Sequence, residues 1–197
     1  MRVLPVTLVG PHLRMEPTTP AHFPGLFAAA DADTFTFFLT RPASWTQPAF
    51  DTWMSKGLAD TGRICFTMLT REGVVVGSSS YLDIQPAHRN LEIGSTWIAP
   101  SHRSTLTNPQ AKLLMLAHAF DTLGCVRVTL KTDGRNLRSQ AAIAKLGAVR
   151  EGTLRRHRIL DDGFVRDTVF FSITDQEWPE VRARLEHRLA KGLASPA

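Results

Sequence analysis

Asn136 and Ser139 are the residues whose types and spacing best suit chemistry in this 197-residue chain. They follow a β-branched run at 126–130 and stand three positions apart where a helix is predicted to begin. In α/β sheets, ligands gather at the carboxyl ends of strands. The position suits an amide that holds a ligand and a hydroxyl that transfers a proton. Both residues could equally serve only to begin the helix, and that alternative stays open.

The composition predicts a folded, basic protein of about one domain. Hydrophobic residues make up 43% of the chain and charged residues 21%, which supports a core and argues against wholesale disorder. The formal net charge is +5. Such a charge favours an anionic partner, whether nucleic acid, phosphorylated cofactor or acidic protein, and fits a solvated basic surface equally well.

Cysteine use and hydropathy indicate a reducing compartment. Cys65 and Cys125 lie in apolar, strand-like runs, and no metal-ligand spacing such as Cys-x-x-Cys is present. We interpret both as buried free thiols and expect no bound metal. The apolar run at 3–9 is too short and interrupted for a signal peptide, and no stretch is long enough to span a membrane. We therefore expect a cytoplasmic protein.

Hydrophobic periodicity and turn residues predict the elements that position these groups. The expected strands are two within 6–17, then 64–70, 73–83, 91–98, 125–132, 149–160 and 164–174. The expected helices are 20–30, 47–59, 108–124, 136–147 and a charged amphipathic helix at 175–191. This order predicts an α+β fold with one mixed sheet. The strands on either side of helix 108–124 are joined by a crossover, so they should be parallel neighbours.

Several segments, in this order, resemble the GCN5-related N-acetyltransferase superfamily, and most closely its ribosomal-protein N-terminal acetyltransferases. They are 92–98, 100–108 with the helix that follows, 136–147 and 151–155. The resemblance covers about residues 6–185. It implies a mixed, mostly antiparallel sheet with a splayed parallel strand pair and helices on both faces. It also implies a single N-acetyltransferase domain at 1–190, with a C-terminal helix and short tail at 175–197.

The resemblance implies acetyl-CoA as the acyl donor. The residues implied to contact it are Trp97, Ile98, Ala99, Arg103, Ser104, Thr105, Leu106, Thr107, Asn108, Asn136, Ala142 and Lys145. Backbone groups of strand 91–98 would pair with the pantetheine arm and hold the oxyanion, and loop 103–108 would cradle the pyrophosphate. Leu106 and Ser104 stand where relatives often have glycine. Because leucine tolerates left-handed backbone angles poorly, we expect a different loop path or weaker CoA binding.

The resemblance also implies the catalytic acid, and the need for a neutral amine calls for a base. Ser139 would protonate the departing CoA thiolate, and Glu92 is the candidate base, with Asp83 and His88 behind it. An outward, salt-bridging role for Glu92 is an equal alternative. Some relatives place a glutamate where this chain has Arg158, so that base is not carried over.

The acceptor is expected to be an amine, either a protein N-terminus or a small molecule. Candidate specificity residues are Trp45, Phe50, Trp53 and His157, while the run 155–158 is read mainly as outward-facing strand residues. The tail helix and final hairpin are candidate surfaces for a homodimer. The competing hypotheses are a CoA-binding protein without turnover and, ranked last because no recognition motif is present, a nucleic-acid-binding protein.

Overall fold

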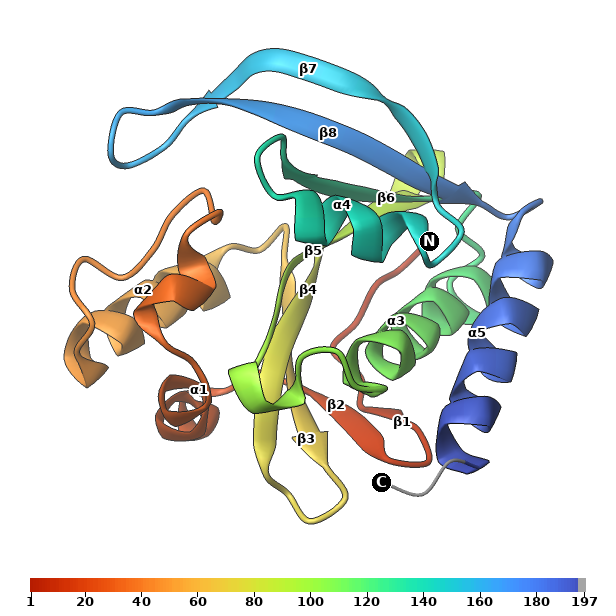
Figure 1. Ribbon diagram of the computed structural model, residues 1–197, viewed down its shortest axis with the longest axis horizontal. Helices are drawn as coiled ribbons and strands as arrows, with labels where there is room; N and C mark the ends of the chain where they lie inside the picture. Colours follow the sequence, from red (N-terminus) through yellow and green to blue (C-terminus); the bar gives the residue numbers. More distant parts are fainter. Residues whose placement is uncertain (195–197) are drawn as a thin grey trace.

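A computed structural model describes residues 1–194. Within them the chain forms an eight-stranded sheet in the order β1-β2-β3-β4-β5-β6-β8-β7 (Figure 1). The strands are β1 (Leu8–Val9), β2 (Leu13–Pro17), β3 (Ile64–Thr70), β4 (Val75–Gln85), β5 (Asn90–Ile98), β6 (Arg127–Asp133), β7 (Val149–Ile159) and β8 (Val165–Thr174). Neighbouring strands pair antiparallel except β5 and β6, which are parallel. The predicted mixed sheet and its parallel pair are therefore confirmed.

Helices cover both faces of the sheet. They are α1 (Phe23–Ala29), α2 (Gln47–Ala59), α3 (Thr107–Ala117), α4 (Leu137–Ala144) and α5 (Trp178–Ala194). Val75 packs with α1 and α2, whereas the next residue, Val76, packs with α3 and α5. Because successive strand residues point to opposite faces, the two groups of helices lie on opposite sides of the sheet.

Two hydrophobic cores result. The larger lies between the sheet and helices α3 to α5 and includes Met68, Leu91 and Met115. The smaller lies on the other face and is mainly aromatic, with Phe35 meeting Trp97 at a centroid distance of 5.7 Å. Trp97 is 5% exposed, so its side chain is part of this core.

The main differences from the predicted elements lie at helix ends. The helix predicted at 108–124 is α3 followed by a π-helical turn at His118–Thr122. The helix predicted from 175 begins at Trp178, because the carboxylate of Glu177 accepts hydrogen bonds from the backbone N–H and hydroxyl of Thr174. The end of the expected tail, 195–197, lies outside the described residues.

The hairpin β7–β8 arches along one edge of the molecule, and its tip reaches toward the segment that joins α1 to α2 (Figure 1). Among residues 1–194, no helix is both long and apolar enough to cross a bilayer. The same residues contain no group of three or more His, Cys, Asp or Glu side chains placed to hold a metal ion.

Candidate active site

The parallel strands β5 and β6 separate soon after they meet. They pair at Asn90 with Arg127, Leu91 with Val128 and Glu92 with Thr129, and both then continue without pairing to each other. Their other edges are bonded to β4 and β8. Residues 93–98 and 130–133 therefore turn unpaired backbone groups toward a gap in the sheet, where a ligand can add as an extra strand.

Irregular pairing between β4 and β5 accompanies the gap. The register shifts between Ser78 and Ser80, and Ser95 adopts a left-handed φ of 48°. Gly77 lies so close to β5 that a Cβ there would overlap the carbonyl oxygen of Trp97. A β-bulge of this kind bends a strand away from its neighbour.

Strand alternation decides which predicted backbone groups face the gap. The N–H of Ala99 donates to the carbonyl of Val76, 2.9 Å away on the β4 side. Because alternate residues of a strand point their N–H groups to opposite edges, the N–H of Ile98 points toward the gap. Of Trp97, Ile98 and Ala99, Ile98 is thus the residue placed to bond a ligand there.

In loop 103–108, the residue with a left-handed backbone conformation is Ser104 and not Leu106. Ser104 has a φ of 63°, whereas Leu106 is the N-cap of α3 with a φ of −78°. Thr105 Oγ1 accepts from the backbone N–H of Thr107 at 3.2 Å. Asn108 lies in the first turn of α3. Leu106 therefore avoids the left-handed conformation, which is taken two positions earlier by Ser104, and weaker CoA binding stays a prediction.

Arg103 is engaged on two sides. Its Nε donates to the carbonyl of Ile98 at 3.2 Å, and its Nη2 donates to Thr34 Oγ1 at 2.9 Å. The side chain therefore ties the end of β5 to the segment between α1 and α2, and it would have to share or exchange these bonds to meet a phosphate.

Asn136 and Ser139 lie together at the start of α4. Asn136 Oδ1 accepts from the backbone N–H of Ser139 at 3.0 Å, which makes Asn136 the N-cap. The Asn136 amide NH₂ and the Ser139 hydroxyl form no hydrogen bond within the described part of the chain. The pair thus begins the helix, and each residue keeps a polar group, whose role toward a ligand stays a prediction. Ala142 and Lys145 lie further along, half-buried and exposed respectively.

Glu92 is engaged in an ion pair. Its Oε2 lies 2.7 Å from Lys131 Nζ, and Asp83 Oδ2 lies 3.9 Å from the same nitrogen. Phe170 completes the site, with its ring centroid 5.0 Å from Lys131 Nζ. The salt-bridging alternative for Glu92 is thus realised in this structure. His88, the other candidate behind Glu92, is exposed on a short turn at Pro86–His88.

Lys112 is a buried cation that the sequence prediction missed. It is 5% exposed, and its Nζ donates to Thr96 Oγ1 at 2.8 Å, which lies 2.7 Å from Ser79 Oγ. Burial lowers the pKa of Lys112 to about 7, against the opposing charge of Glu92. The available signal was its position among apolar residues on the buried face of α3.

A second ionic cluster surrounds the buried carboxylate of Asp133. Asp133, at the end of β6, accepts hydrogen bonds from Arg135 Nε and Nη2 at 3.0 and 2.8 Å, and Arg166 Nε lies 4.0 Å away. Burial alone would raise the pKa of Asp133, but hydrogen bonds from Arg135 and both guanidinium charges lower it. Arg135 stacks 3.6 Å from the Phe164 ring centroid, and Arg166 donates to the carbonyl of Phe37. The cluster fastens the hairpin to the α1–α2 segment.

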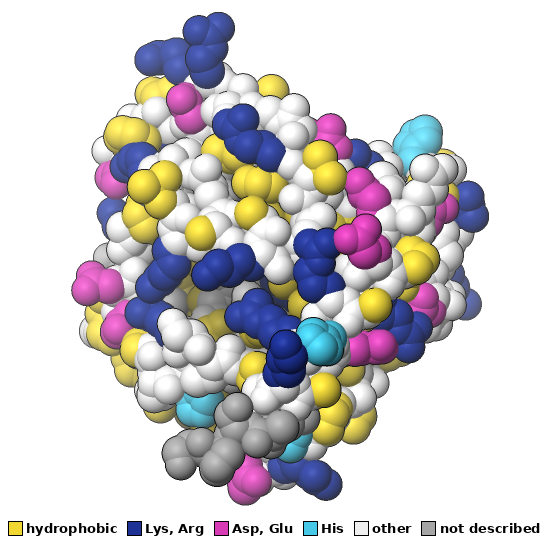
Figure 2. Space-filling view, turned by 45° about the vertical axis from the view of Figure 1, so that its right-hand side comes forward, with side chains coloured by type: hydrophobic (Ala, Val, Ile, Leu, Met, Phe, Trp, Pro, Cys, Tyr) yellow, Lys and Arg dark blue, Asp and Glu magenta, His cyan; other side chains and the backbone are white. Residues whose placement is uncertain are grey.

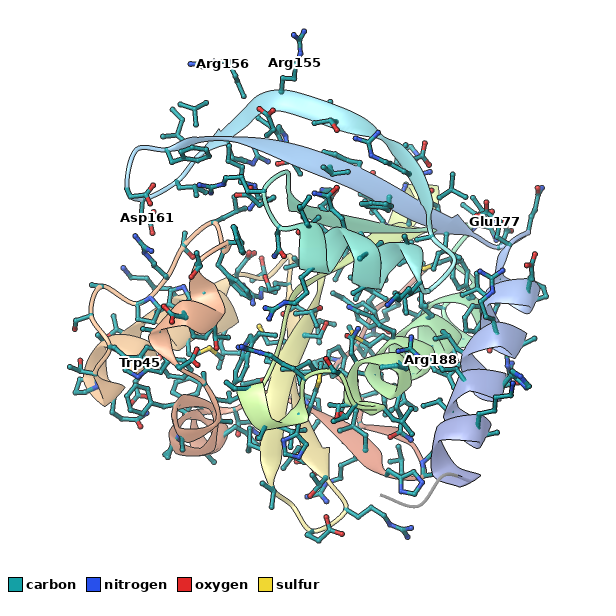
Figure 3. All side chains as sticks on the ribbon, in the orientation of Figure 1. Trp45, Arg155, Arg156, Asp161, Glu177 and Arg188 are labelled. Atoms are coloured by element: carbon teal, nitrogen blue, oxygen red, sulfur yellow. The ribbon has the colours of Figure 1, made fainter. Side chains whose placement is uncertain are left out.

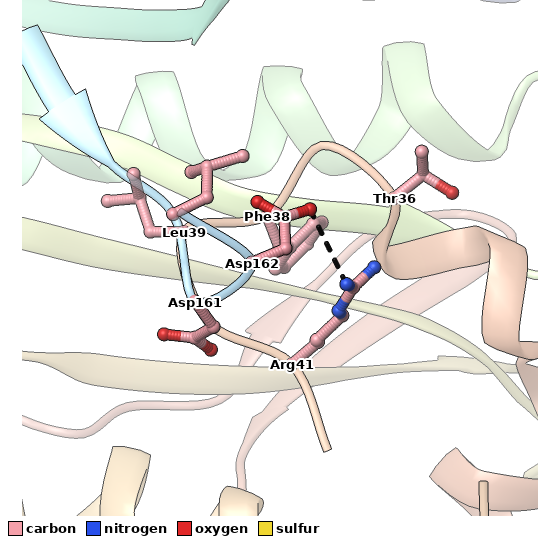
Figure 4. A pocket seen from close by; sticks show the side chains of 7 residues that line it. Thr36, Phe38, Leu39, Arg41, Asp161 and Asp162 are labelled. Atoms are coloured by element: carbon pink, nitrogen blue, oxygen red, sulfur yellow. Dashed lines mark ion pairs between the residues drawn. The ribbon is translucent and has the colours of Figure 1, made fainter. Parts of the chain in front are cut away.

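The contact between the hairpin tip and the α1–α2 segment leaves little space (Figure 4). A cavity of about 10 Å³ is lined by Thr36, Phe38, Leu39, Arg41, Leu160, Asp161 and Asp162. Arg41 Nη2 pairs with Asp162 Oδ2 at 3.6 Å (Figure 4), and both side chains are half exposed. Such a volume holds no more than a water molecule. This contact therefore joins two parts of the fold and leaves no room for a larger ligand.

The candidate specificity residues lie in two different places. Phe50 is fully buried, and Trp45 and Trp53 pack against Phe35, so these three belong to the aromatic core. His157 instead lies against Phe170, with ring centroids 5.6 Å apart, on the same side as Lys131. Its Nδ1 is buried without a hydrogen-bond partner among the described residues. Burial, and then the charges of Arg158, Lys131 and Arg166, lower the pKa of His157.

Cations gather on the face that carries α5 and surround a hollow (Figure 2). The exposed basic residues of α4, its C-cap and α5 are Arg138, Lys145, Arg182, Arg184, Arg188 and Lys191. Two of them are already in ion pairs, Arg182 with Asp121 and Glu186, and Arg184 with Glu180. Arg184 lies over the end of α4, since a Cβ on Gly147 would be 3.2 Å from its Nη1. Arg188 lies beside α3, whereas Arg155 and Arg156 point away from the molecule (Figure 3). The outward reading of these two strand residues is confirmed.

A family model described as the acetyltransferase (GNAT) domain matches residues 12–149. The chain belongs to the GNAT acetyltransferase family. No curated protein matches the sequence. As a member of this family the protein is an N-acetyltransferase, which confirms the function class that the sequence indicated.

Solved structures agree with the family. A protein from T. thermophilus assigned as an acetyltransferase is 39% identical, with a TM-score of 0.90 over 96% of this chain and 100% of that one. A GCN5-related N-acetyltransferase from Brucella melitensis is 29% identical, with a TM-score of 0.87 over 94% and 86%. Mycobacterium smegmatis RimJ, solved with CoA-disulfide, is similar in fold at 23% identity, with a TM-score of 0.78 over 93% and 95%.

The residues present in this acetyltransferase fit CoA. The open edges of β5 and β6 offer unpaired N–H and C=O groups to an amide-bearing arm. The first turn of α3 offers N–H groups and a positive dipole end to phosphate. The cations on α4 and α5 supply further charge for an anionic ligand.

Proposed function

We propose that this protein transfers an acetyl group from acetyl-CoA to a primary amine by direct attack in a ternary complex. The divergence of β5 and β6 after Glu92 and Thr129 is the observation that carries the proposal. The pantetheine arm pairs with residues 93–98 as an added strand. Loop 103–108 and the first turn of α3 hold the pyrophosphate, and Arg103, Asn136, Ala142 and Lys145 line the path of the cofactor.

The reacting groups line this gap. The N–H of Ile98 bonds the pantetheine arm, and an N–H on the free edge of β5 nearer to Glu92 stabilises the oxyanion that forms when the amine attacks. Ser139 gives its hydroxyl proton to the leaving sulfur. A thiol has a pKa near 8.5, so modest acid assistance is sufficient. Glu92 accepts the proton that the nitrogen loses.

The acceptor is a protein N-terminus or a small amine. An α-amino group has a pKa of about 7.7–8.0, so an appreciable fraction is neutral and nucleophilic near pH 7. Lys131, Arg158 and Arg166 lie near His157 on the acceptor side, and they disfavour polycationic acceptors through like-charge repulsion. An acceptor with an anionic group near its amine suits this charge best.

A CoA-binding protein without turnover is the second candidate. The ion pair between Glu92 and Lys131, 2.7 Å apart, favours it, because Lys131 occupies the carboxylate that would serve as base. Arg158 also stands where a carboxylate would otherwise be available.

Two measurements on the purified protein test the proposal. Calorimetry with acetyl-CoA measures binding, and release of free thiol is followed with a panel of N-terminal peptides and small primary amines. We expect saturable binding and thiol release with part of the panel. Binding without thiol release across a broad panel would support the second candidate, and absence of binding would overturn both.

A further inference from the structure

Lys131 is a primary amine held where an acceptor amine would have to react. It lies on β6, two residues beyond Thr129, which is the last residue of β6 paired with β5. Its side chain is 21% exposed, and its Nζ lies 2.7 Å from Glu92 Oε2. The ammonium therefore lies at the closed end of the gap, on the proposed catalytic carboxylate.

The surroundings of Lys131 match the chemistry of an ammonium site. Glu92 and Asp83 supply two carboxylates, at 2.7 and 3.9 Å from Nζ, and the face of Phe170 supplies a cation–π contact at 5.0 Å. Two carboxylates and an aromatic face are groups that would also receive the amine of an external substrate. The amine of Lys131 thus occupies the position that the amine of an external acceptor would take.

The direction of the CoA arm brings the thioester toward this amine. The phosphate-binding loop 103–108 follows the far end of β5, and the arm pairs back along 93–98 toward the point where β5 rejoins β6. The acyl end of an arm that runs this way is the end nearest Glu92 and Lys131. This step rests on the proposed function, because it requires acetyl-CoA in the gap.

We propose that Lys131 is a site of acetylation by its own molecule, with acetyl-CoA as the donor. Glu92 removes a proton from the Lys131 ammonium, and the nitrogen lone pair forms a C–N bond with the thioester carbon. The C–S bond breaks, and its electron pair leaves on the sulfur of CoA. Of the two protons that the nitrogen loses, one reaches the sulfur by way of Ser139, and the other leaves through Glu92 to water. The products are a neutral Nζ-acetyl amide and free CoA.

Other lysines of the chain provide internal controls. Lys56 is exposed on α2 and reports any acetylation by acetyl-CoA in bulk solution. Lys112 is 5% exposed and bonded to Thr96 on the other side of the sheet, so it reports whether burial alone favours the reaction. Neither forms an ion pair within the described residues, whereas Lys131 does.

The test is incubation of the full chain with acetyl-CoA and no added amine, followed by peptide mass spectrometry of every lysine. We expect acetyl at Lys131 to accumulate at least about tenfold faster than at Lys56, with a rate constant that does not change with protein concentration. Glu92→Gln and Ser139→Ala should each slow the modification of Lys131 and leave Lys56 unchanged. Circular dichroism melting checks that both variants are folded, and Lys131→Arg confirms the assignment of the peptide.

Several results would overturn the inference. They are an unmodified Lys131, modification no faster than at Lys56, a rate that rises with protein concentration, or an unchanged rate in both folded variants. Calorimetry on the same sample distinguishes failure of this inference from failure of the proposed function. If acetyl-CoA binds and Lys131 stays unmodified, this inference alone fails, whereas absence of binding removes the proposed function as well.

Discussion

Single side chains in this protein combine structural and chemical tasks. Asn136 caps α4 with its amide oxygen and keeps its NH₂ group for a ligand. Ser139 donates its backbone N–H to that cap, which leaves its hydroxyl for proton transfer. The cap fixes the distance between the two residues, so the position of the hydroxyl follows from the start of the helix.

Replacing Ser139 tests its proposed role as the acid. Ser139→Ala removes the hydroxyl and keeps the backbone N–H that completes the cap. We expect turnover to fall by about 10- to 100-fold while the affinity for acetyl-CoA stays within about twofold. Thiol release measures the first quantity and calorimetry the second, with the exposed Ser55→Ala as a matched control. Unchanged turnover would remove Ser139 from the mechanism.

Lys112 predicts a particular dependence of stability on pH. Its pKa is about 7 in the folded state and near 10.4 in the unfolded chain, so between these values the unfolded state binds more protons. The free energy of unfolding therefore gains a contribution that rises with pH above 7, and below 7 the full cost of the buried charge remains.

Lys112→Met removes that contribution. We expect this variant to unfold with a free energy higher than that of the parent by about 1 kcal/mol or more at pH 7, and the difference to shrink toward pH 9. Urea denaturation at several pH values measures it, with exposed Lys56→Met as the control. The range stops at pH 9 because burial raises the pKa of Cys125 to about 11, which acts in the opposite direction. A difference that grows with pH would contradict this assignment.

At the scale of elements, the start of α3 is organised by the contact of Leu106 with α5. A Cβ on Gly192 would lie 2.7 Å from Leu106 Cδ2, so the leucine side chain packs directly against the last turns of α5. Leu106 also borders a pocket of about 280 Å³ that includes Leu189 of α5 and no residue of β5 or β6. Leu106 thus joins the loop to the C-terminal helix.

This contact and the backbone angle of Leu106 determine what a glycine at this position would do. Because the φ of Leu106 is −78°, there is no left-handed strain for glycine to relieve. We expect Leu106→Gly to lower the free energy of unfolding by about 2 kcal/mol, from lost packing and a more flexible unfolded chain, without tightening CoA binding. Thermal melting and calorimetry check this, with Leu106→Met as a volume-conserving control. Tighter binding by the glycine variant would show that the side chain obstructs the ligand.

The sequence was informative about elements and less so about what they place together. Periodicity predicted the bounds of α2 and β3 as they are found, because strong apolar patterns end there at turn residues. The start of α5 was missed because a side-chain bond at Glu177 forms a turn before the helix. The meeting of Lys131 with Glu92 depends on the register of two strands more than thirty residues apart, which no local pattern contains.

At the scale of the whole molecule, the two faces of the sheet carry different groups. The face with α3, α4 and α5 carries the helix N-termini and the basic surface, while the other carries Glu92, Lys131, His157 and the aromatic core (Figures 1 and 2). Within residues 1–194, the gap between β5 and β6 is where the sheet opens between the two faces. A homodimer stays a prediction, and the outward arginines of the edge strand β7 disfavour pairing of two copies along that edge.

Hydrogen–deuterium exchange with and without acetyl-CoA tests the central claim most directly. The account predicts that bound acetyl-CoA slows exchange at the amides of 93–98 and at the first turn of α3, because the arm pairs with the free edge of β5 and the phosphates bond the helix start. Amides of β3, which pair on both sides already, should not change and serve as the control. Saturating acetyl-CoA that leaves the exchange of 93–98 unaltered would contradict the account.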